Sequence, residues 1–194
     1  MLLLDKHFWN NKYITSKTGW DVGEITTPLK EYFDQLENKK VKILIPGCGN
    51  AYEAEYLFNN KFLSTFVLDY SENALNNFIK RVPKFSKKNL LNNDFFEIQG
   101  KYDIIVEQTF FCAINKNRRH DYFLKMHDLL NPNGKLVGLL FDNPLNENHP
   151  PYGGSESEYK KYFEPYFNIK VFEKSYNSIQ ARKGMELFMI LSKK

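Results

Sequence analysis

Two glycines and an aspartate form the pattern in this sequence that is best suited to binding a ligand. An apolar run at residues 41–45 leads into Gly47 and Gly49, and an amphipathic stretch begins at Tyr52. Glycines at such a strand-to-helix turn let a ligand approach the backbone closely, and the start of a helix offers unpaired N–H groups. Asp69 ends the next apolar run, 20 residues after Gly49, where an acid that accepts hydrogen bonds from ribose hydroxyls is expected. Together these residues predict a site for an adenosine-containing cofactor.

Both features also have structural interpretations that need no ligand. Gly47 and Gly49 could simply make a tight turn. Asp69 could cap the helix that follows it, although Ser71 could fill that role as well or better. The sequence alone leaves these alternatives open.

The residues around the turn distinguish between two classes of adenosine cofactor. A dinucleotide site favours a third glycine where this sequence has Tyr52, and Glu53 adds negative charge close to where a diphosphate would lie. S-adenosylmethionine has no phosphate, and it carries an ammonium and a sulfonium group that acidic residues suit. The turn therefore favours S-adenosylmethionine over NAD.

The segments that would position this turn alternate between short apolar runs and longer amphipathic stretches. Strands that are apolar on both faces and alternate with helices are typical of a parallel sheet built from right-handed βαβ units. The expected strands are residues 41–45, 64–68, 102–106 and 135–141, and the expected helices are residues 53–59, 71–82 and 118–130. Residues 131–134, Asn-Pro-Asn-Gly, predict a turn before the last of these strands.

The two ends of the chain complete the predicted fold. Ser155 and Glu158 have the spacing of a capping box, which opens a helix to about residue 163, and a further helix is expected at residues 27–36. The last two apolar runs are only eight residues apart, too close for a crossover helix, so they should pair antiparallel at residues 169–176 and 185–191. We therefore expect an α/β fold with a doubly wound, mostly parallel sheet and a C-terminal antiparallel strand pair.

The expected organisation is one domain spanning residues 1–194. It would consist of an aromatic-rich arm at residues 1–26 and an α/β core at residues 27–194. No repeat, low-complexity tract or Gly/Ser-rich linker divides the chain. A monomer is favoured, although the sequence does not fix the oligomeric state.

The composition excludes several classes of protein. Of the 194 residues, 42% are hydrophobic, and no apolar run approaches the roughly 18 residues of a membrane span. Residues 1–4 are followed at once by charged and polar residues and lack the features of a signal peptide. Cys48 and Cys112 cannot form a disulfide framework and are expected to be free thiols. These features predict a cytoplasmic protein without a membrane partner.

Charge and histidine content argue against two further kinds of site. The net charge of +4 comes from lysines scattered along the chain, and short clusters such as Arg118-Arg119 are interpreted as solubilising surface, so no nucleic-acid partner is expected. The four histidines lie far apart in sequence without a cysteine cluster, so no metal site is expected.

Several uncommon segments occur in an order that is similar to one known family. From about residue 8 to the C-terminus, the sequence resembles the thiopurine S-methyltransferase family of class I S-adenosylmethionine-dependent enzymes, and within it the thiol and halide methyltransferases. The resemblance implies a Rossmann-like sheet of seven strands. The segments that carry it are Phe8-Trp9, Tyr13, Thr18 to Gly23, Pro46-Gly47-Cys48-Gly49, Asp94-Phe95-Phe96, Tyr102-Asp103, Phe111 to Ile114, Pro150-Pro151-Tyr152 and Arg182-Lys183-Gly184.

The resemblance also implies roles for individual cofactor-binding residues. Aromatic residues of the arm would cover the cofactor, where an aromatic face attracts a sulfonium and an apolar lid removes water. Thiopurine enzymes tend to have Trp and Arg where this sequence has Tyr13 and Gln108. The implied contacts are Trp9, Tyr13 and Trp20 over the cofactor, Gly47 and Gln108 at the methionine part, Asp69 at the ribose, and Asp94 and Phe95 at the adenine. Core packing is the structural alternative for Trp9, Trp20 and Phe95.

The implied reaction is in-line transfer of a methyl group to a small soft nucleophile such as a thiol, halide or sulfide-like anion. Since a thiol with a pKa near 8.5 already supplies some thiolate at neutral pH, no strong general base is required. The expected acceptor residues are Trp20, Phe110, Phe111 and Tyr152, with Arg182 as an attractor of an anionic acceptor. Two alternatives remain: a small-molecule oxygen or nitrogen acceptor, or RNA as a rarer case, and a protein that binds S-adenosylmethionine without catalysis.

Overall fold

A computed structural model describes residues 3–194, which form two compact units, an N-terminal unit of residues 3–98 and a C-terminal unit of residues 99–194. The N-terminal unit contains three parallel strands, β1 (Ile43–Pro46), β2 (Thr65–Leu68) and β3 (Leu90–Leu91). The expected strands at residues 41–45 and 64–68 are confirmed by β1 and β2. The third strand was not predicted, because two residues are too few to give a recognisable apolar pattern.

Four helices accompany these strands among the described residues. They are α1 (Lys6–Ile14), α2 (Thr27–Asp34), α3 (Tyr52–Asn59) and α4 (Glu72–Arg81). All but α1 were predicted from the sequence. Helix α1 lies in the arm and has no buried residue, so it lacks the apolar face by which a helix is recognised. It is started by Asp5, whose carboxylate accepts a hydrogen bond from the Phe8 N–H at 2.9 Å.

The C-terminal unit contains one parallel pair of strands and two antiparallel pairs. Its strands are β4 (Tyr102–Gln108), β5 (Leu130–Phe141), β6 (Phe167–Lys174) and β7 (Glu186–Lys193). β4 is parallel to β5, while β7 lies between β5 and β6 and is antiparallel to both. The expected antiparallel strand pair is therefore confirmed. The turn expected at residues 131–134 lies inside β5, where the pairing with β4 jumps from Leu130 to Lys135.

The described part of the C-terminal unit has two α-helices, α5 (Arg119–Leu129) and α6 (Glu156–Phe163). It also has three short 3₁₀ helices, η2 (Phe111–Ala113), η3 (Lys116–Arg118) and η4 (Gln180–Arg182). One further 3₁₀ helix, η1 (Lys87–Asn89), lies in the N-terminal unit. The capping role of Ser155 is confirmed, because its hydroxyl oxygen accepts a hydrogen bond from the Glu158 N–H at 3.3 Å.

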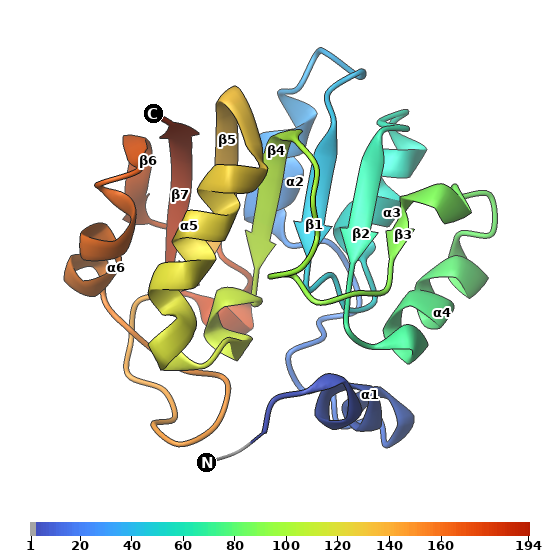
Figure 1. Cartoon of the computed structure of the whole chain (residues 1–194), viewed down its shortest axis with the longest axis horizontal. Coiled ribbons are helices and arrows are strands. Elements are labelled where there is room, and N and C mark those ends of the chain that lie inside the picture. Colours follow the sequence, from blue (N-terminus) through green and yellow to red (C-terminus); the bar gives the residue numbers. More distant parts are fainter. Residues whose placement is uncertain (1–2) are drawn as a thin grey trace. The chain divides into compact units, whose positions relative to one another are not determined.

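The seven strands have the sheet order β3-β2-β1-β4-β5-β7-β6 (Figure 1). The prediction of a mostly parallel, doubly wound sheet with antiparallel C-terminal strands is confirmed. The organisation as a single domain with an arm remains a prediction. Cys48 and Cys112 are both free and buried. Between residues 3 and 194, the structure has no helix that is long and apolar enough to cross a membrane.

Candidate active site

The glycine turn after β1 has the backbone geometry that only glycine adopts easily. Gly47 and Gly49 have φ angles of 57° and 54°, in the left-handed region. A Cβ atom at Gly49 would lie 2.7 Å from the hydroxyl oxygen of Tyr13, which rules out a larger residue unless Tyr13 moves. The Cys48 N–H donates a hydrogen bond to the Leu68 carbonyl at 3.0 Å, which fastens the turn to the end of β2. The turn is thus tight, and the Tyr13 hydroxyl occupies the space beside Gly49 where a side chain would lie.

Asp69 connects this turn to the end of β2. One carboxylate oxygen accepts a hydrogen bond from the Gly49 N–H at 2.8 Å, and the other accepts one from the Ser71 N–H at 2.7 Å. The carboxyl group is buried, and burial raises its pKa to about 6, although the two backbone hydrogen bonds act to lower it. Ser71, not Asp69, caps α4, because its hydroxyl oxygen accepts a hydrogen bond from the Ala74 N–H at 3.2 Å. The capping alternative for Asp69 is therefore wrong.

Three aromatic residues of the arm pack together over the glycine turn. The Trp20 ring makes edge contacts with the rings of Trp9 and Tyr13, at centroid distances of 5.8 Å and 6.0 Å. Its side chain also donates a hydrogen bond to the Tyr13 oxygen, while burial raises the pKa of Tyr13 far above its usual range. Because the Tyr13 hydroxyl lies against Gly49, this aromatic cluster reaches the part of the turn where a cofactor would lie.

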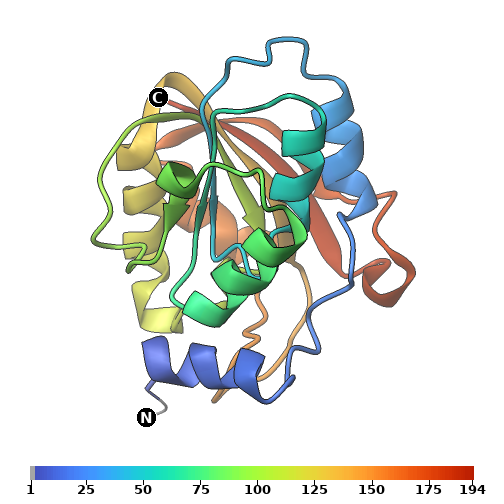
Figure 2. The ribbon, with the colours of Figure 1, turned by 90° about the vertical axis from the view of Figure 1, so that its right-hand side faces the viewer.

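Polar contacts hold the arm against the loops of the same unit. The side-chain oxygen of Asn10 accepts hydrogen bonds from the Ser71 hydroxyl at 2.9 Å and from the backbone and side-chain nitrogens of Asn73 at 3.2 Å and 2.9 Å. Lys6 donates to the side-chain oxygen of Asn92 at 3.0 Å. Figure 2 shows α1 lying along the start of α4. Sequence reasoning missed Asn10, because it is one of many polar residues in the arm and nothing in its position distinguishes it.

The loop after β3 contributes to a polar hollow of about 260 Å³. Its lining residues are Lys6, Tyr70, Asn92, Asn93, Asp94 and Glu97. Asp94 accepts a hydrogen bond from the Phe96 N–H at 2.8 Å, which fixes its carboxylate at the edge of the hollow. The neighbouring Phe95 is buried and meets the Phe96 ring at 5.1 Å. The predicted adenine residues thus differ: Asp94 faces a hollow, and Phe95 packs inside the unit.

In the C-terminal unit, Gln108 belongs to a buried cluster around Glu186. The Glu186 carboxylate interacts with Gln108, accepts a hydrogen bond from the Ser178 hydroxyl at 2.7 Å and lies 3.6 Å from Arg182. Burial raises the pKa of Glu186, whereas these polar neighbours lower it. The positive charge of Arg182 is therefore already matched by a buried carboxylate, which weakens the argument that Arg182 attracts an anionic acceptor.

Glu107 holds the segment in which Phe110 and Phe111 lie. Its carboxylate is fully buried and accepts hydrogen bonds from the Phe110 N–H at 2.8 Å, the Phe111 N–H at 2.9 Å and the Tyr122 hydroxyl. Thr109, between the strand and these two N–H groups, has a φ of 56°, which is unusual for a β-branched residue. The carboxylate thus fixes a strained turn at the end of β4.

Glu107→Gln should flatten the dependence of stability on pH. Burial raises the pKa of Glu107 to about 7, so the folded protein binds more protons than the unfolded chain between about pH 4.5 and 7, and the free energy of unfolding falls as the pH rises through that range. Gln keeps an oxygen for the two backbone N–H groups, and the Tyr122 hydroxyl can turn to accept from its NH₂. Urea unfolding at pH 5 and pH 8 should show a smaller loss of stability for the variant than for the wild type. Parallel losses in the two proteins would contradict this prediction, and the exposed Glu97→Gln is the control.

The two phenylalanines of this segment have different environments. Phe111 is 1% exposed, and its ring packs at 4.9 Å and 5.4 Å from the rings of Tyr122 and Tyr159. Phe110 is half-buried and lies 6.0 Å from Tyr122. Phe111 therefore belongs to the hydrophobic core of its unit, and of the pair only Phe110 has a partly open ring for an acceptor.

The backbone of Tyr152 is hydrogen-bonded to the segment that carries Phe110 and Phe111. Its N–H donates a hydrogen bond to the Cys112 carbonyl at 2.7 Å, and its ring is buried, with the Lys116 ammonium 5.7 Å from the ring centre. The structure thus brings together Phe110, Phe111 and Tyr152, three of the expected acceptor residues. It places Gln108 and Arg182 in the separate cluster around Glu186.

Comparison with known proteins decides the family. The family model described as thiopurine S-methyltransferase matches residues 4–188. The chain belongs to this family. It is 30% identical over 185 residues to probable thiol methyltransferase 2 of Arabidopsis thaliana, covering 92% of this chain and 81% of the relative. It is 28% identical to thiocyanate methyltransferase 1 of Brassica oleracea over 186 residues, with the same two coverages.

A solved structure shows the same fold in a more distant protein. The 1,6-didemethyltoxoflavin-N1-methyltransferase of Burkholderia thailandensis, determined with bound S-adenosylhomocysteine, superimposes with a TM-score of 0.78 at 13% identity, covering 97% of this chain and 87% of that chain. The family and the fold that were predicted from the sequence are thereby confirmed. The predicted methyltransferase class and cofactor agree with these relatives.

In this member of the thiopurine S-methyltransferase family, the sequence-based prediction for Arg119 is wrong. The Arg118-Arg119 pair was interpreted as solubilising surface, and the Arg118 side chain is indeed 45% exposed. The Arg119 side chain is 1% exposed and pairs with Glu158 at 2.6 Å. A usable signal was its spacing, because Arg119, Tyr122, Phe123 and Met126 occupy the buried face of α5.

Proposed function

We propose that the chain transfers the methyl group of S-adenosylmethionine to a small thiol or a similar soft nucleophile. The observation that carries this proposal is the hydrogen bond from the Gly49 N–H to the Asp69 carboxylate, with the aromatic cluster of Trp9, Tyr13 and Trp20 over the same turn. Family membership supports the reaction class. Two relatives are named thiol and thiocyanate methyltransferases, which supports a sulfur acceptor.

The N-terminal unit fits S-adenosylmethionine in its chemistry. Each Asp69 oxygen accepts one backbone hydrogen bond and keeps lone-pair capacity for a ribose hydroxyl. The turn at Gly47 has no side chain to block the methionine part, and the hollow beside Asp94 is polar, as an adenine edge requires. When bound, the cofactor supplies an activated methyl group. The aromatic cluster would offer ring faces to its positive charge and keep water away.

The residues of the C-terminal unit fit an acceptor that needs no covalent help. Burial raises the pKa of Cys112 to about 12, so this thiol stays protonated and is not a nucleophile at neutral pH. Within this unit the proposed acceptor contacts are Phe110 and Tyr152, whose aromatic rings suit a small apolar thiol. The acceptor role of Trp20, in the N-terminal unit, stays a prediction. Because Arg182 is matched by Glu186, we propose that neutral thiols, which ionise during the reaction, are better acceptors than permanent anions.

The first test is binding followed by an acceptor panel. Calorimetry should show one S-adenosylhomocysteine bound per chain, and product analysis should show methylation of small thiols faster than of thiocyanate or iodide. Absence of binding would contradict the cofactor assignment. Binding without turnover on any thiol, halide, hydroxyl or amine would favour a non-catalytic binding protein.

A second candidate keeps the cofactor but changes the acceptor. One solved structure that shares the fold is an N-methyltransferase, so nitrogen and oxygen acceptors belong in the same panel. A preference for an amine or hydroxyl compound would favour this candidate. We do not expect a nucleic-acid acceptor, and salt-sensitive RNA binding would argue otherwise. We also propose a cytoplasmic location, because two free, buried thiols suit a reducing compartment.

A further inference from the structure

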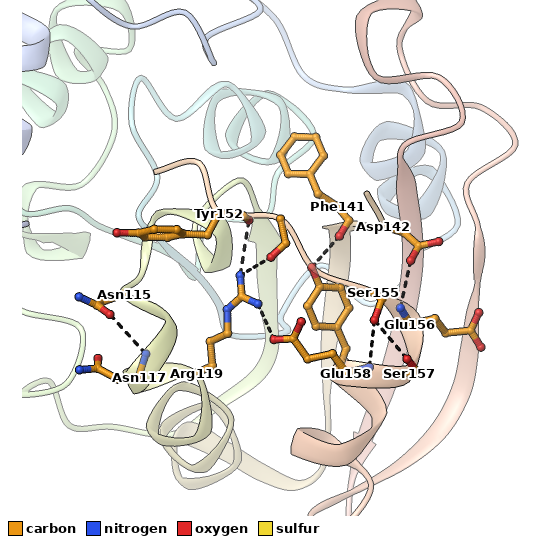
Figure 3. A network of polar contacts seen from close by, with 12 residues as sticks. Asn115, Asn117, Arg119, Phe141, Asp142, Tyr152, Ser155, Glu156, Ser157 and Glu158 are labelled. Carbon is orange, nitrogen blue, oxygen red and sulfur yellow. Dashed lines mark hydrogen bonds and ion pairs between the residues drawn. The ribbon is translucent and has the colours of Figure 1, made fainter. Parts of the chain in front are cut away.

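Arg119, the first residue of α5, carries a buried charge that joins two separate segments of the C-terminal unit. One guanidinium nitrogen lies 2.6 Å from a Glu158 carboxylate oxygen. Another donates hydrogen bonds to the carbonyl oxygens of Gly153 at 2.7 Å and Tyr152 at 3.5 Å. Figure 3 shows the side chain pointing from α5 into the loop that carries Tyr152. The guanidinium therefore fixes the backbone of this loop from one side.

The same guanidinium also contacts the segment that carries Phe110. It lies over the Phe111 ring, 4.7 Å from the ring centre, and 5.8 Å from the ring centre of Tyr159. Both segments of the proposed acceptor site thus meet at one charged group. A lysine could not reproduce this arrangement, because it lacks the planar fork that bonds a carboxylate and a carbonyl while stacking on a ring.

The loop has little freedom to move around this anchor. The Tyr152 N–H donates to the Cys112 carbonyl at 2.7 Å, and the Gly154 N–H donates to the Asn143 carbonyl at 3.2 Å. A Cβ at Gly153 would lie 2.2 Å from the Asn143 carbonyl oxygen, so the backbone passes its neighbour very closely. The backbone of Tyr152 is therefore held at its N–H by Cys112 and at its carbonyl by Arg119, so a change at Arg119 removes one of these two anchors.

Stability alone is a poor explanation for this ion pair, in which the Arg119 side chain is 1% exposed while that of Glu158 is 37% exposed. Burying a charge costs free energy that the partner returns only in part, and replacing such pairs by apolar residues is often neutral or stabilising. The Nε atom of Arg119 has no hydrogen-bond partner among the described residues, which adds to the cost. What the pair does provide is a fixed geometry between α5, the Phe111 segment and the loop.

We propose that Arg119 is a positioning residue for the methyl acceptor. It sets the separation between the Phe110-Phe111 segment and Tyr152, and in this way determines which acceptors fit. This inference rests on the proposed function. It adds a specificity role for a residue that touches neither the acceptor nor the cofactor.

The kinetic test compares Arg119→Lys and Glu158→Gln with Arg118→Lys, the exposed neighbour. For a thiol that the wild-type protein methylates, Arg119→Lys should raise the acceptor KM about tenfold, with kcat changed less, because displacement of the loop weakens acceptor binding. Glu158→Gln should show a smaller rise, and Arg118→Lys no rise. The Kd for S-adenosylhomocysteine should stay within about twofold of wild type in all three. An unchanged KM, or a KM and Kd that rise in parallel, would overturn the proposal.

A second measurement does not depend on activity. Hydrogen exchange at the Tyr152 and Gly154 amides should be faster in Arg119→Lys than in wild type, by about tenfold, while β4 amides keep their protection. Unchanged exchange at both loop amides would show that Arg119 does not anchor the loop. If the wild-type protein methylates nothing, the proposed function fails, and the exchange experiment still decides the anchoring role.

Discussion

Replacing Asp69 with Asn should weaken the binding of S-adenosylhomocysteine by about 100-fold, the size expected from losing a charge-assisted hydrogen bond and misdirecting a second one. The carboxylate accepts one backbone N–H on each oxygen. An Asn side chain has one oxygen, so its NH₂ group must face either the Gly49 or the Ser71 N–H. The variant thus loses the negative charge and disturbs the glycine turn at the same time.

The measurement can use the protein's own fluorescence. The chain has 2 tryptophans, Trp9 and Trp20, and both belong to the aromatic cluster over the turn. Titration with S-adenosylhomocysteine should change their emission in the wild type, and the midpoint should move for Asp69→Asn. Ser71→Ala is the matched control: it removes the cap of α4 and one of the three hydrogen bonds to Asn10 but keeps the backbone N–H that Asp69 accepts. It should lose about 1 kcal/mol of stability, with a much smaller change in affinity than Asp69→Asn. Equal affinity of wild type and Asp69→Asn would contradict the assignment.

Trp20→Ala should lower kcat/KM by about 100-fold, through weaker cofactor binding and entry of water. Trp20 is the central ring of the cluster, since it contacts both Trp9 and Tyr13 and donates a hydrogen bond to Tyr13. Its loss leaves the other two rings without the partner that holds them over the turn.

Two further variants separate the contributions of Trp20. Trp20→Phe keeps an aromatic ring but removes the N–H donor, and an intermediate loss is expected. Val22→Ala changes an exposed residue of the same arm and should leave the kinetics as in wild type. Steady-state kinetics with a small thiol measures all three. Wild-type kinetics for Trp20→Ala would show that the arm does not cover the cofactor.

The sequence predicted β1 and β2 well because these strands are almost entirely apolar. β1 and β2 have almost no exposed residue, so their pattern was unambiguous. Helix α1 was missed for the opposite reason: it buries no residue and is held by polar contacts from Asn10, which leave no periodic pattern. The extension of β5 through residues 131–134 was missed because turn residues are tolerated where the pairing with β4 is interrupted.

At the site, spacing predicted some residues and could not predict others. Asp69 was found because its distance from Gly49 reflects a strand, a turn and a helix of ordinary length. Arg119 was missed because adjacent residues on a helix face different directions: Arg118 lies on the surface and Arg119 in the core. The spacing of Arg119 to the apolar residues of α5 is the signal in the sequence that distinguishes the two arginines.

The most direct test of the proposed function follows the methyl group itself. The protein is incubated with S-adenosylmethionine that carries an isotope-labelled methyl group and with a small neutral thiol, and the products are separated. We predict one labelled methyl thioether for each S-adenosylhomocysteine formed, with Asp69→Asn greatly slowed. Formation of no labelled thioether from any thiol, by a protein that is folded and binds S-adenosylhomocysteine, would contradict S-methylation as its activity.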